Sequence, residues 1–393
     1  MARWTLFLGS NWLAYDISGS SLAVGLVSFA SSGAYLLSPF GGWLSDRYDR
    51  RTTLQVSRLA AFFGAVGLSA ITFMGFIEVW QLVLVSFLGG FTRATEQPAE
   101  QSLLPNTVPP SVLLNAVTLN SAAFSGARLI GPIAGAPLLA TVGGGGVFAL
   151  AAVAYLVAGV MVHQVHIRST GDVAAFRTIF TNLRDAAGYV SRTPEVLMIF
   201  ALVALHCALT MAFDSLLPEF TIQALNGGQL EYNELLIGVG AGALFGTLGI
   251  ATVRRPRARG ALVLVAGVGS GVFPFAMGLS QDVVSSSAAA VGIGATQGIF
   301  MAITATLLQS VVPDGMRGRV MSLYVMLTAG LMALMNLSNG FFADRVGAPI
   351  LFAVPGLIFA AIVIAWSLAQ RELRNVYRTG ELRRRTSAVI GVS

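Results

Sequence analysis

The chain has 393 residues, of which 55% are hydrophobic and only 11% are charged, and its net charge is +6. A soluble domain carries roughly 25% charged residues, so this composition excludes a soluble globular protein and indicates an integral membrane protein. All basic residues are arginine. There is therefore no P-loop lysine, and direct ATP-driven transport by this chain is not expected. One cysteine and three histidines exclude a disulfide framework and leave little for a metal site, and we expect no cofactor.

The apolar segments are long and continuous, without the alternating pattern of barrel strands, and therefore predict membrane-spanning α-helices. The first segment is too short for the ~20 residues that a span needs, which indicates either a start upstream of Met1, our preferred interpretation, or a truncated chain. The twelve predicted helices cover residues 4–17, 21–44, 53–76, 79–104, 113–142, 147–166, 195–224, 234–253, 261–279, 283–311, 319–343 and 348–370.

The arginines alternate between the two sides of this topology. Twenty of the 24 lie in one set of loops, in nearby helix ends and in the C-terminal tail. The positive-inside rule then places both termini and these loops in the cytoplasm, with the protein in the inner membrane. The predicted organisation is an N-terminal six-helix bundle (1–167), a cytoplasmic linker (168–194), a C-terminal six-helix bundle (195–370) and a basic tail (371–393).

An internal repeat supports two related halves. At an offset of 204 residues, identities recur both around the loop at 42–51 and through the region 103–143. The same offset aligns two separated regions of the chain, which is typical of transporters built from duplicated bundles.

The loop between the second and third predicted helices contains Gly42, Asp46, Arg47, Arg50 and Arg51 in the spacing G-x-x-x-D-R-x-x-R-R. Together with twelve helices in two halves, this loop resembles the corresponding motif of the major facilitator superfamily. The resemblance implies an all-α membrane fold in which Asp46, with Arg47 and Arg51, forms a gate that holds the halves closed on the cytoplasmic side. Positive-inside topology alone explains Arg50 and Arg51 but not the aspartate.

The fifth predicted helix carries Gly131, Pro132 and Gly135, which resemble the antiporter motif G-x-x-x-G-P-x-x-G-G with alanine in place of its first and last glycines. Close helix packing and helix bending explain the same residues. The stretches 93–132 and 312–323 resemble the enterobactin and macrolide exporter branch. These resemblances imply drug or siderophore efflux by proton antiport.

Five polar residues share one face of the fourth predicted helix, because their spacing is i, i+3, i+4, i+7 and i+8. An intramembrane charge costs ~2.5–3.5 kcal/mol and is expected to face a cavity. Either Glu96 or Glu100 is then a candidate proton carrier, although Glu100 is near enough to the cytoplasmic end to be simply solvated. The five are Arg93, Glu96, Gln97, Glu100 and Gln101.

Arg128 lies near the centre of the fifth predicted helix, where a guanidinium facing lipid is not tolerated. We expect Glu96 to be its partner, either in the substrate pathway or in a purely structural ion pair. In the seventh predicted helix, His206 and Asp214 share one face, and both are candidates for the proton pathway. A lone histidine among apolar neighbours also fits a packing role.

Together these features predict a secondary transporter that exports a small amphipathic molecule, such as a drug, a siderophore or another secondary metabolite, in exchange for protons. Its expected partners are the substrate, protons and the bilayer, with no nucleic acid, and we expect a monomer. Two alternatives stay open: an importer or uniporter, and a non-transporting sensor or scaffold with the same fold. We expect no enzymatic activity, because no nucleophile–base constellation or metal cluster stands out.

Overall fold

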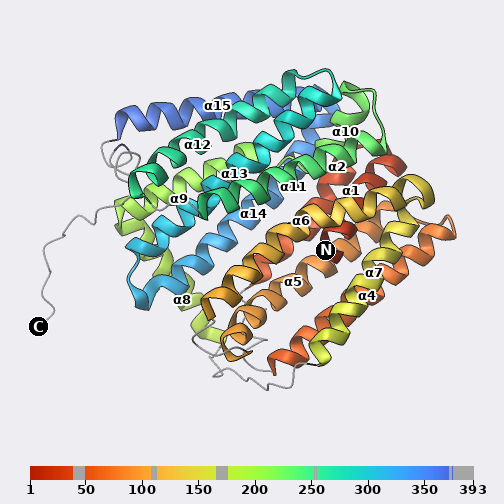
Figure 1. Ribbon diagram of the computed structural model, residues 1–393, viewed down its shortest axis with the longest axis horizontal. Coiled ribbons are helices and arrows are strands. Elements are labelled where there is room, and N and C mark those ends of the chain that lie inside the picture. The colour runs from red at the N-terminus through yellow and green to blue at the C-terminus, as the bar shows by residue number, and fades with distance from the viewer. Residues whose placement is uncertain are drawn as a thin grey trace, which may run out of the picture.

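A computed structural model describes residues 1–38, 49–107, 113–164, 176–251, 253, 255–370 and 374. In this part of the chain the regular structure is helical throughout (Figure 1). The N-terminal helices are α1 (Ala2–Ser18), α2 (Ser21–Gly33) with a 3₁₀ turn η1 (Ala34–Leu37), α4 (Arg50–Phe73), α5 (Val79–Thr107), α6 (Leu113–Val142) and α7 (Gly144–His163). They are followed by α8 (Phe176–Arg192), α9 (Pro194–His206), η3 (Cys207–Met211), α10 (Leu217–Glu219), η4 (Phe220–Ala224), α11 (Gln229–Ala251), α12 (Pro256–Leu279), α13 (Val283–Val311), α14 (Asp314–Val346) and α15 (Ala348–Ala369).

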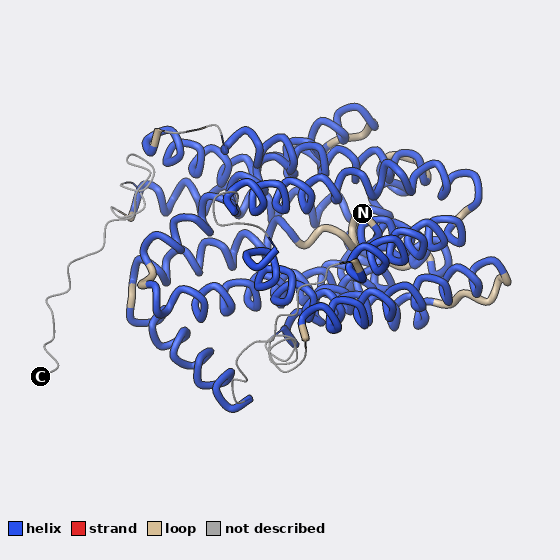
Figure 2. The backbone as a smooth tube through the Cα atoms, turned by 60° about the horizontal axis from the view of Figure 1, so that its bottom comes forward, coloured by secondary structure: helices blue, strands red, loops and turns tan. Residues whose placement is uncertain are grey.

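The long helices run roughly along the long axis of the molecule and lie side by side (Figures 1 and 2). Most helix contacts lie either among α1–α7 or among α9–α15, for example α4 with α7 and α12 with α15. These two sets of helices, the N-terminal and C-terminal halves, meet mainly where α2 packs on α14 and where α6 packs on α11. The interface between the halves is therefore formed mainly by these four helices.

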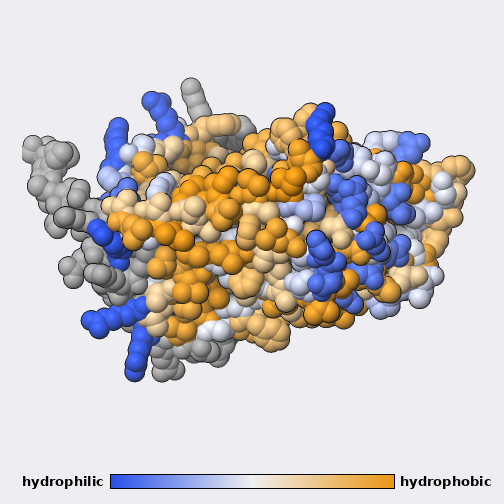
Figure 3. Space-filling model, turned by 90° about the horizontal axis from the view of Figure 1, so that it is seen from above, coloured by the Kyte–Doolittle hydropathy of each residue, from blue (hydrophilic) through white to orange (hydrophobic). Residues whose placement is uncertain are grey.

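Eight of the described helices are long and apolar enough to cross a membrane, and shorter apolar helical stretches cover Ser21–Leu37 and Gly126–Val142. Apolar side chains cover the middle of the molecule in Figure 3, and hydrophilic ones gather toward its two ends. We call one end the arginine-rich end, because Arg51, Arg192, Arg255 and Arg317 lie there at helix termini, and the opposite one the acidic end. The acidic end carries Glu78, Glu219, Glu231, Asp282 and Asp344.

The prediction of one continuous helix over 195–224 is wrong. Helix α9 passes into the π-helical turn η3, and the chain then leaves helical geometry at Ala212, whose φ and ψ are −90° and 60°. Backbone groups that a continuous helix would pair internally must find other partners inside a membrane protein. Side-chain amides of the neighbouring helices supply them here. Pro218, in the first turn of α10, follows the break.

The predicted cytoplasmic linker contains a helix of its own. Helix α8 packs against α9 and α14, and its residues Ala186 and Val190 are buried in the same apolar core as Val196 and Val320. Arg319 and Asp185 form an ion pair of 3.1 Å on the surface of this contact. The linker is thus docked on the C-terminal half.

Candidate functional site

Arg128 lies where α6 meets the C-terminal half. A Cβ atom added to Gly240 of α11 would lie 3.1 Å from the carbonyl oxygen of Arg128, so the two backbones approach closely. The guanidinium carbon of Arg128 is 5.2 Å from the ring centre of Trp4, and the side chain keeps partial solvent exposure. Across the interface, Asp214 lies within electrostatic range of Arg128, although these two described side chains form no ion pair. One of these two charges comes from each half.

Asp214 lies in the non-helical segment between η3 and α10. The Gln297 side-chain amide donates to the carbonyl oxygen of Thr210 at 2.7 Å, and the Asn339 amide donates to that of Ala212 at 2.5 Å. On the other side of Asp214, the backbone N–H of Ser215 donates to Oδ1 of Asn336 at 3.2 Å. Amide side chains of α13 and α14 thus fix the backbone that presents this carboxylate. Discontinuous helices of this kind form the binding sites of many secondary transporters.

Arg3 and Trp4 are site residues that the sequence reasoning missed. The guanidinium carbon of Arg3 is 5.7 Å from the Trp4 ring and 5.6 Å from the Tyr35 ring, and its Nη1 donates to the Tyr35 hydroxyl at 3.0 Å. Two guanidinium groups therefore lie over the indole of Trp4. A Cβ atom at Gly131 would lie only 2.5 Å from the Cβ atom of Trp4, so this position needs glycine. The sequence feature that could have identified them is an arginine next to a tryptophan at the start of an apolar segment.

Glu96 pairs with Arg58, with its Oε1 3.4 Å from Nε of Arg58. The expectation of a Glu96–Arg128 partnership therefore needs correction. Arg58 lies inside α4, eight residues beyond the helix start, and neighbouring Ser57 and Thr95 also share a hydrogen bond of 3.1 Å. This face of α5 is thus turned toward α4 rather than toward the centre of α6.

Three other predicted site residues, Arg93, Gln97 and Glu100, also lie on α5. Arg93 and Gln97 are half-buried, like the interface residues around Arg128. The backbone of Glu100 is helical, and its side chain lies outside the described residues.

His206 is fully buried inside the C-terminal half. Its ring lies 4.5 Å from that of Phe300 and 5.2 Å from that of Phe359, and Nδ1 is 2.8 Å from the hydroxyl of Thr210. We expected His206 and Asp214 to share one helix face because we assumed a regular α-helix. The π-turn and the break between them change the direction in which residues after position 206 point around the helix axis. The structure therefore does not bring His206 and Asp214 together.

The predicted gate motif is described only in part. Gly42, Asp46 and Arg47 lie outside the described residues, as does the side chain of Arg50. Arg51 is near the start of α4, and its Nη2 donates to the carbonyl oxygen of His163 at the end of α7. Asp49 precedes it and caps α4 by accepting from the Thr52 N–H at 3.0 Å.

The halves are joined at the acidic end by carboxylates. Asp344 of α14 accepts from the Ser20 hydroxyl at 2.5 Å and from the backbone N–H of Ser21 at 2.7 Å, and so caps α2 from the opposite half. The hydroxyl of Ser21 donates to Glu219. Farther in, a Cβ atom at Gly25 would lie 2.9 Å from the carbonyl oxygen of Asn336, so α2 and α14 pack tightly. This end of the interface is closed in the structure.

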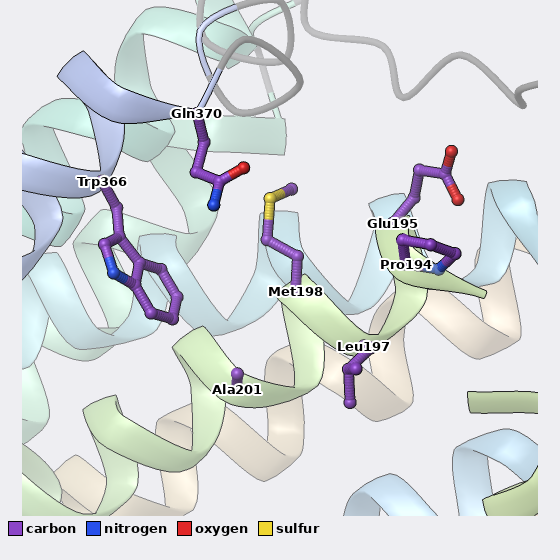
Figure 4. Close-up of a pocket in the computed structure, with 7 residues that line it drawn as sticks. All are labelled: Pro194, Glu195, Leu197, Met198, Ala201, Trp366 and Gln370. Carbon is purple, nitrogen blue, oxygen red and sulfur yellow. The ribbon is translucent and has the colours of Figure 1, made fainter. Parts of the chain in front are cut away.

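A pocket of about 310 Å³ opens between α9 and the end of α15 (Figure 4). Leu197, Met198 and Ala201 of α9 line it together with Trp366 and Gln370. None of the predicted site residues contributes to it. It is a feature of the surface at the arginine-rich end, separate from the Arg128–Asp214 pair.

The fold and the interface between the halves define a multi-pass transporter of the major facilitator superfamily. Among solved structures, the chain is similar to a D-xylose–proton symporter, with a TM-score of 0.67, 16% identity and coverage of 92% of this chain and 94% of that one. It is also similar to a transporter of the POT family, with a TM-score of 0.71, 13% identity and coverage of 95% of both chains.

The sequence profile of the transmembrane secretion effector family matches residues 1–381, and the chain belongs to that family. Three relatives from bacteria are similar over most of their length. The staphyloferrin A transporter of Staphylococcus aureus is 22% identical over 95% of this chain and 94% of its own. The macrolide efflux protein A of Streptococcus pyogenes is 22% identical (88% and 87%), and the multidrug efflux pump Tap of Mycolicibacterium fortuitum is 24% identical (90% and 89%).

The family membership confirms the predicted superfamily and fold, and it confirms a transporter of small molecules rather than an enzyme.

Proposed function

We propose that the protein exports a small amphipathic organic molecule across the inner membrane in exchange for protons. The names of its relatives, which include efflux proteins for a macrolide and for multiple drugs, support this direction. The antiporter-like residues Gly131, Pro132 and Gly135 support the coupling to protons, and Gly131 is also the position on which Trp4 packs. The arginine-rich end faces the cytoplasm in this proposal, as do both termini.

The observation that carries the proposal is that Arg128 and Asp214, one from each half, both lie at the interface between the halves. Gly240 of α11 packs on the backbone of Arg128. Phe213 and Leu216, which neighbour Asp214 in sequence, share an apolar core with Leu8 and Trp12 of α1. An ionised Asp214 draws the halves together through Arg128, and a proton on Asp214 cancels that attraction. Intramembrane charges of this kind are expensive and mark ion and substrate pathways. Asp214 is therefore the proposed proton carrier. Trp4 and the guanidinium groups over it form one wall of the substrate site.

The remaining predicted residues take secondary roles in this mechanism. Glu96, buried and paired with Arg58, is the second candidate for the proton, followed by Glu100. Arg93 and Gln97 belong to the polar lining of α5. His206 is a packing residue of the C-terminal half. The motif Gly42, Asp46, Arg47, Arg50 and Arg51 is the proposed cytoplasmic gate, opposite the contact of Asp344 with α2.

The test uses everted membrane vesicles with an imposed proton gradient and a panel of lipophilic antibiotics and siderophores. The readout is proton movement that depends on the added compound. We expect Asp214→Asn to abolish this movement, while Asp16→Asn, which changes an exposed carboxylate at the end of α1, leaves it intact. If Glu96→Gln abolishes the movement and Asp214→Asn does not, coupling belongs to the Glu96–Arg58 pair. Compound-dependent movement that survives both changes overturns the proposed coupling sites.

A further inference from the structure

A groove runs between α4 and α7 on the outer surface of the N-terminal half, where the two helices lie side by side (Figure 1). Its volume is about 260 Å³. The walls are apolar and partly exposed, and Val56, Val157 and Met161, which adjoin the lining residues in sequence, are exposed as well. Leu59, Phe62, Leu156 and Val160 line the walls. A surface of this kind faces lipid chains once the helices span a bilayer.

One end of the groove is polar and lies at the arginine-rich end. Nε2 of Gln55 is 3.0 Å from Nδ1 of His163, and Nη2 of Arg51 donates to the carbonyl oxygen of His163 and lies 3.5 Å from its Nδ1. Within the described part of the chain, the hydrogen-bond acceptor of Arg51 is thus a backbone carbonyl group rather than a carboxylate. Arg58, deeper in the groove, is already paired with Glu96. Through its contact with His163, Arg51 therefore places a guanidinium group at this end of the groove.

The floor of the groove is open because residue 159 is glycine. A Cβ atom added there would meet only the Cβ atom of Arg58, at 3.9 Å. In the repeat register, the counterpart of Gly159 in the second half is Val363, which is fully buried. A Cβ atom at Gly267 of α12 would lie 3.2 Å from Val363. The equivalent space between α12 and α15 is thus filled by a side chain.

We propose that this groove binds one anionic phospholipid from the cytoplasmic leaflet, with an acyl chain along Gly159 and the phosphate beside Arg51. An apolar channel that ends in an arginine matches the two parts of such a lipid. Basic sites between transmembrane helices on the cytoplasmic side favour anionic headgroups over zwitterionic ones. The occupant would lie directly against Arg58, the ion-pair partner of Glu96, and so next to the polar face of α5.

The test is native mass spectrometry of the full-length protein in detergent, titrated with phosphatidylglycerol or phosphatidylcholine of the same chain length. We expect one phosphatidylglycerol to bind with at least a fivefold preference, about the effect of one arginine near an anionic headgroup. Arg51→Gln should remove that preference. Arg257→Gln is the matched control, because Arg257 is also the second residue of its helix at the same end and should leave the preference unchanged.

A second pair of variants tests the groove itself. Gly159→Leu places a side chain in the open floor and should reduce phosphatidylglycerol binding without changing any charge. Gly67→Leu on α4, the other helix of the groove, is its control and should have no effect, because a new Cβ atom there would meet nothing within 4 Å. Equal binding of the two lipids, equal effects of Arg51→Gln and Arg257→Gln, or unchanged binding in Gly159→Leu would each overturn the proposal. Lipid binding is measured without transport, so the outcome is independent of the proposed function.

Discussion

The two halves share a helical topology but bring opposite chemistry to their interface. The N-terminal half contributes arginines, with the guanidinium groups of Arg3 and Arg128 both near the Trp4 ring. The C-terminal half contributes carboxylates: Asp214, on a backbone held by neutral amides, and Asp344 and Glu219 at the acidic end. A duplicated fold thus keeps its helix packing while its two copies diverge in charge. Neither half alone contains the complete site.

The same contrast holds on the outer surface. In the second half, α12 and α15 approach through Gly271 and Gly356, whose added Cβ atoms would each clash with the backbone of the other helix. In the first half, α4 and α7 leave a groove beside Gly159. Close helix packing in membranes depends on small residues at the contact. Equivalent helix pairs can therefore differ: a glycine at the contact lets two helices pack closely, whereas a glycine beside the contact leaves a groove.

Exchanging the charges of the two halves tests the comparison most strongly. Arg128→Asp and Asp214→Arg should each lower the initial transport rate about 100-fold, because an unpaired intramembrane charge costs ~2.5–3.5 kcal/mol and each 1.4 kcal/mol is tenfold. The double variant again has opposite charges at the two positions, and its initial transport rate should be at least tenfold higher than that of either single variant. The measurement is compound-dependent proton movement in everted vesicles. Exchanging Arg319 with the exposed Asp185 is the control and should leave the rate unchanged. A double variant no better than its single variants would contradict the pairing.

The amides of the C-terminal half come next in expected effect. Asn336→Leu leaves the buried N–H of Ser215 without its acceptor, which should cost ~1–3 kcal/mol of stability. Asn233→Leu is the matched control: Asn233 is also buried, and within the described residues its amide atoms have no hydrogen-bond partner. Thermal unfolding in detergent should show a clear loss of stability for Asn336→Leu and little change for Asn233→Leu. Equal losses would mean that the amide does not support the break.

A smaller effect is expected at the acidic end, where the halves are joined by Asp344. Asp344→Asn removes the charge that caps α2, and a cap of this kind contributes ~0.5–2 kcal/mol. The fraction of molecules whose halves are separated at the acidic end should rise several-fold. The labelling rate of a cysteine introduced next to Ser20 measures this fraction.

The matched control for Asp344→Asn is Asp282→Asn. Asp282 caps α13 within one half, and the hydroxyl and backbone N–H of Ser285 hold the pKa of its carboxyl below the ordinary value. Its loss should leave the opening unchanged. Identical labelling in both variants would show that Asp344 does not hold the halves together.

The smallest effect concerns the docking of α8. Arg319 and Asp185 are both substantially exposed, with side-chain exposures of 41% and 54%, and exposed pairs contribute ~0–1 kcal/mol. Arg319→Gln should therefore barely change the unfolding temperature, whereas Val190→Asp, which places a charge in the buried side of α8, should lower it clearly. A large loss in Arg319→Gln would mean that this pair, rather than apolar burial, docks the linker.

The membrane fold and the transporter superfamily could be predicted from the sequence. Apolar length, the alternation of arginines and the loop motif around Asp46 indicate a two-half transporter, because hydropathy and topology are local properties of the chain. Arg128 and Asp214 were recognised by the cost of placing a charge in the bilayer.

The tertiary structure decided which charges face one another. Glu96 pairs with Arg58 rather than with Arg128, because the rotation of each helix is set by its neighbours rather than by its own spacing. The break beside Asp214 depends on Gln297, Asn336 and Asn339, which are distant in sequence and supply the hydrogen bonds that a membrane interior cannot. Hydropathy determines that a segment crosses the bilayer. Only the packing of the other helices determines where its backbone can open and what its charges meet.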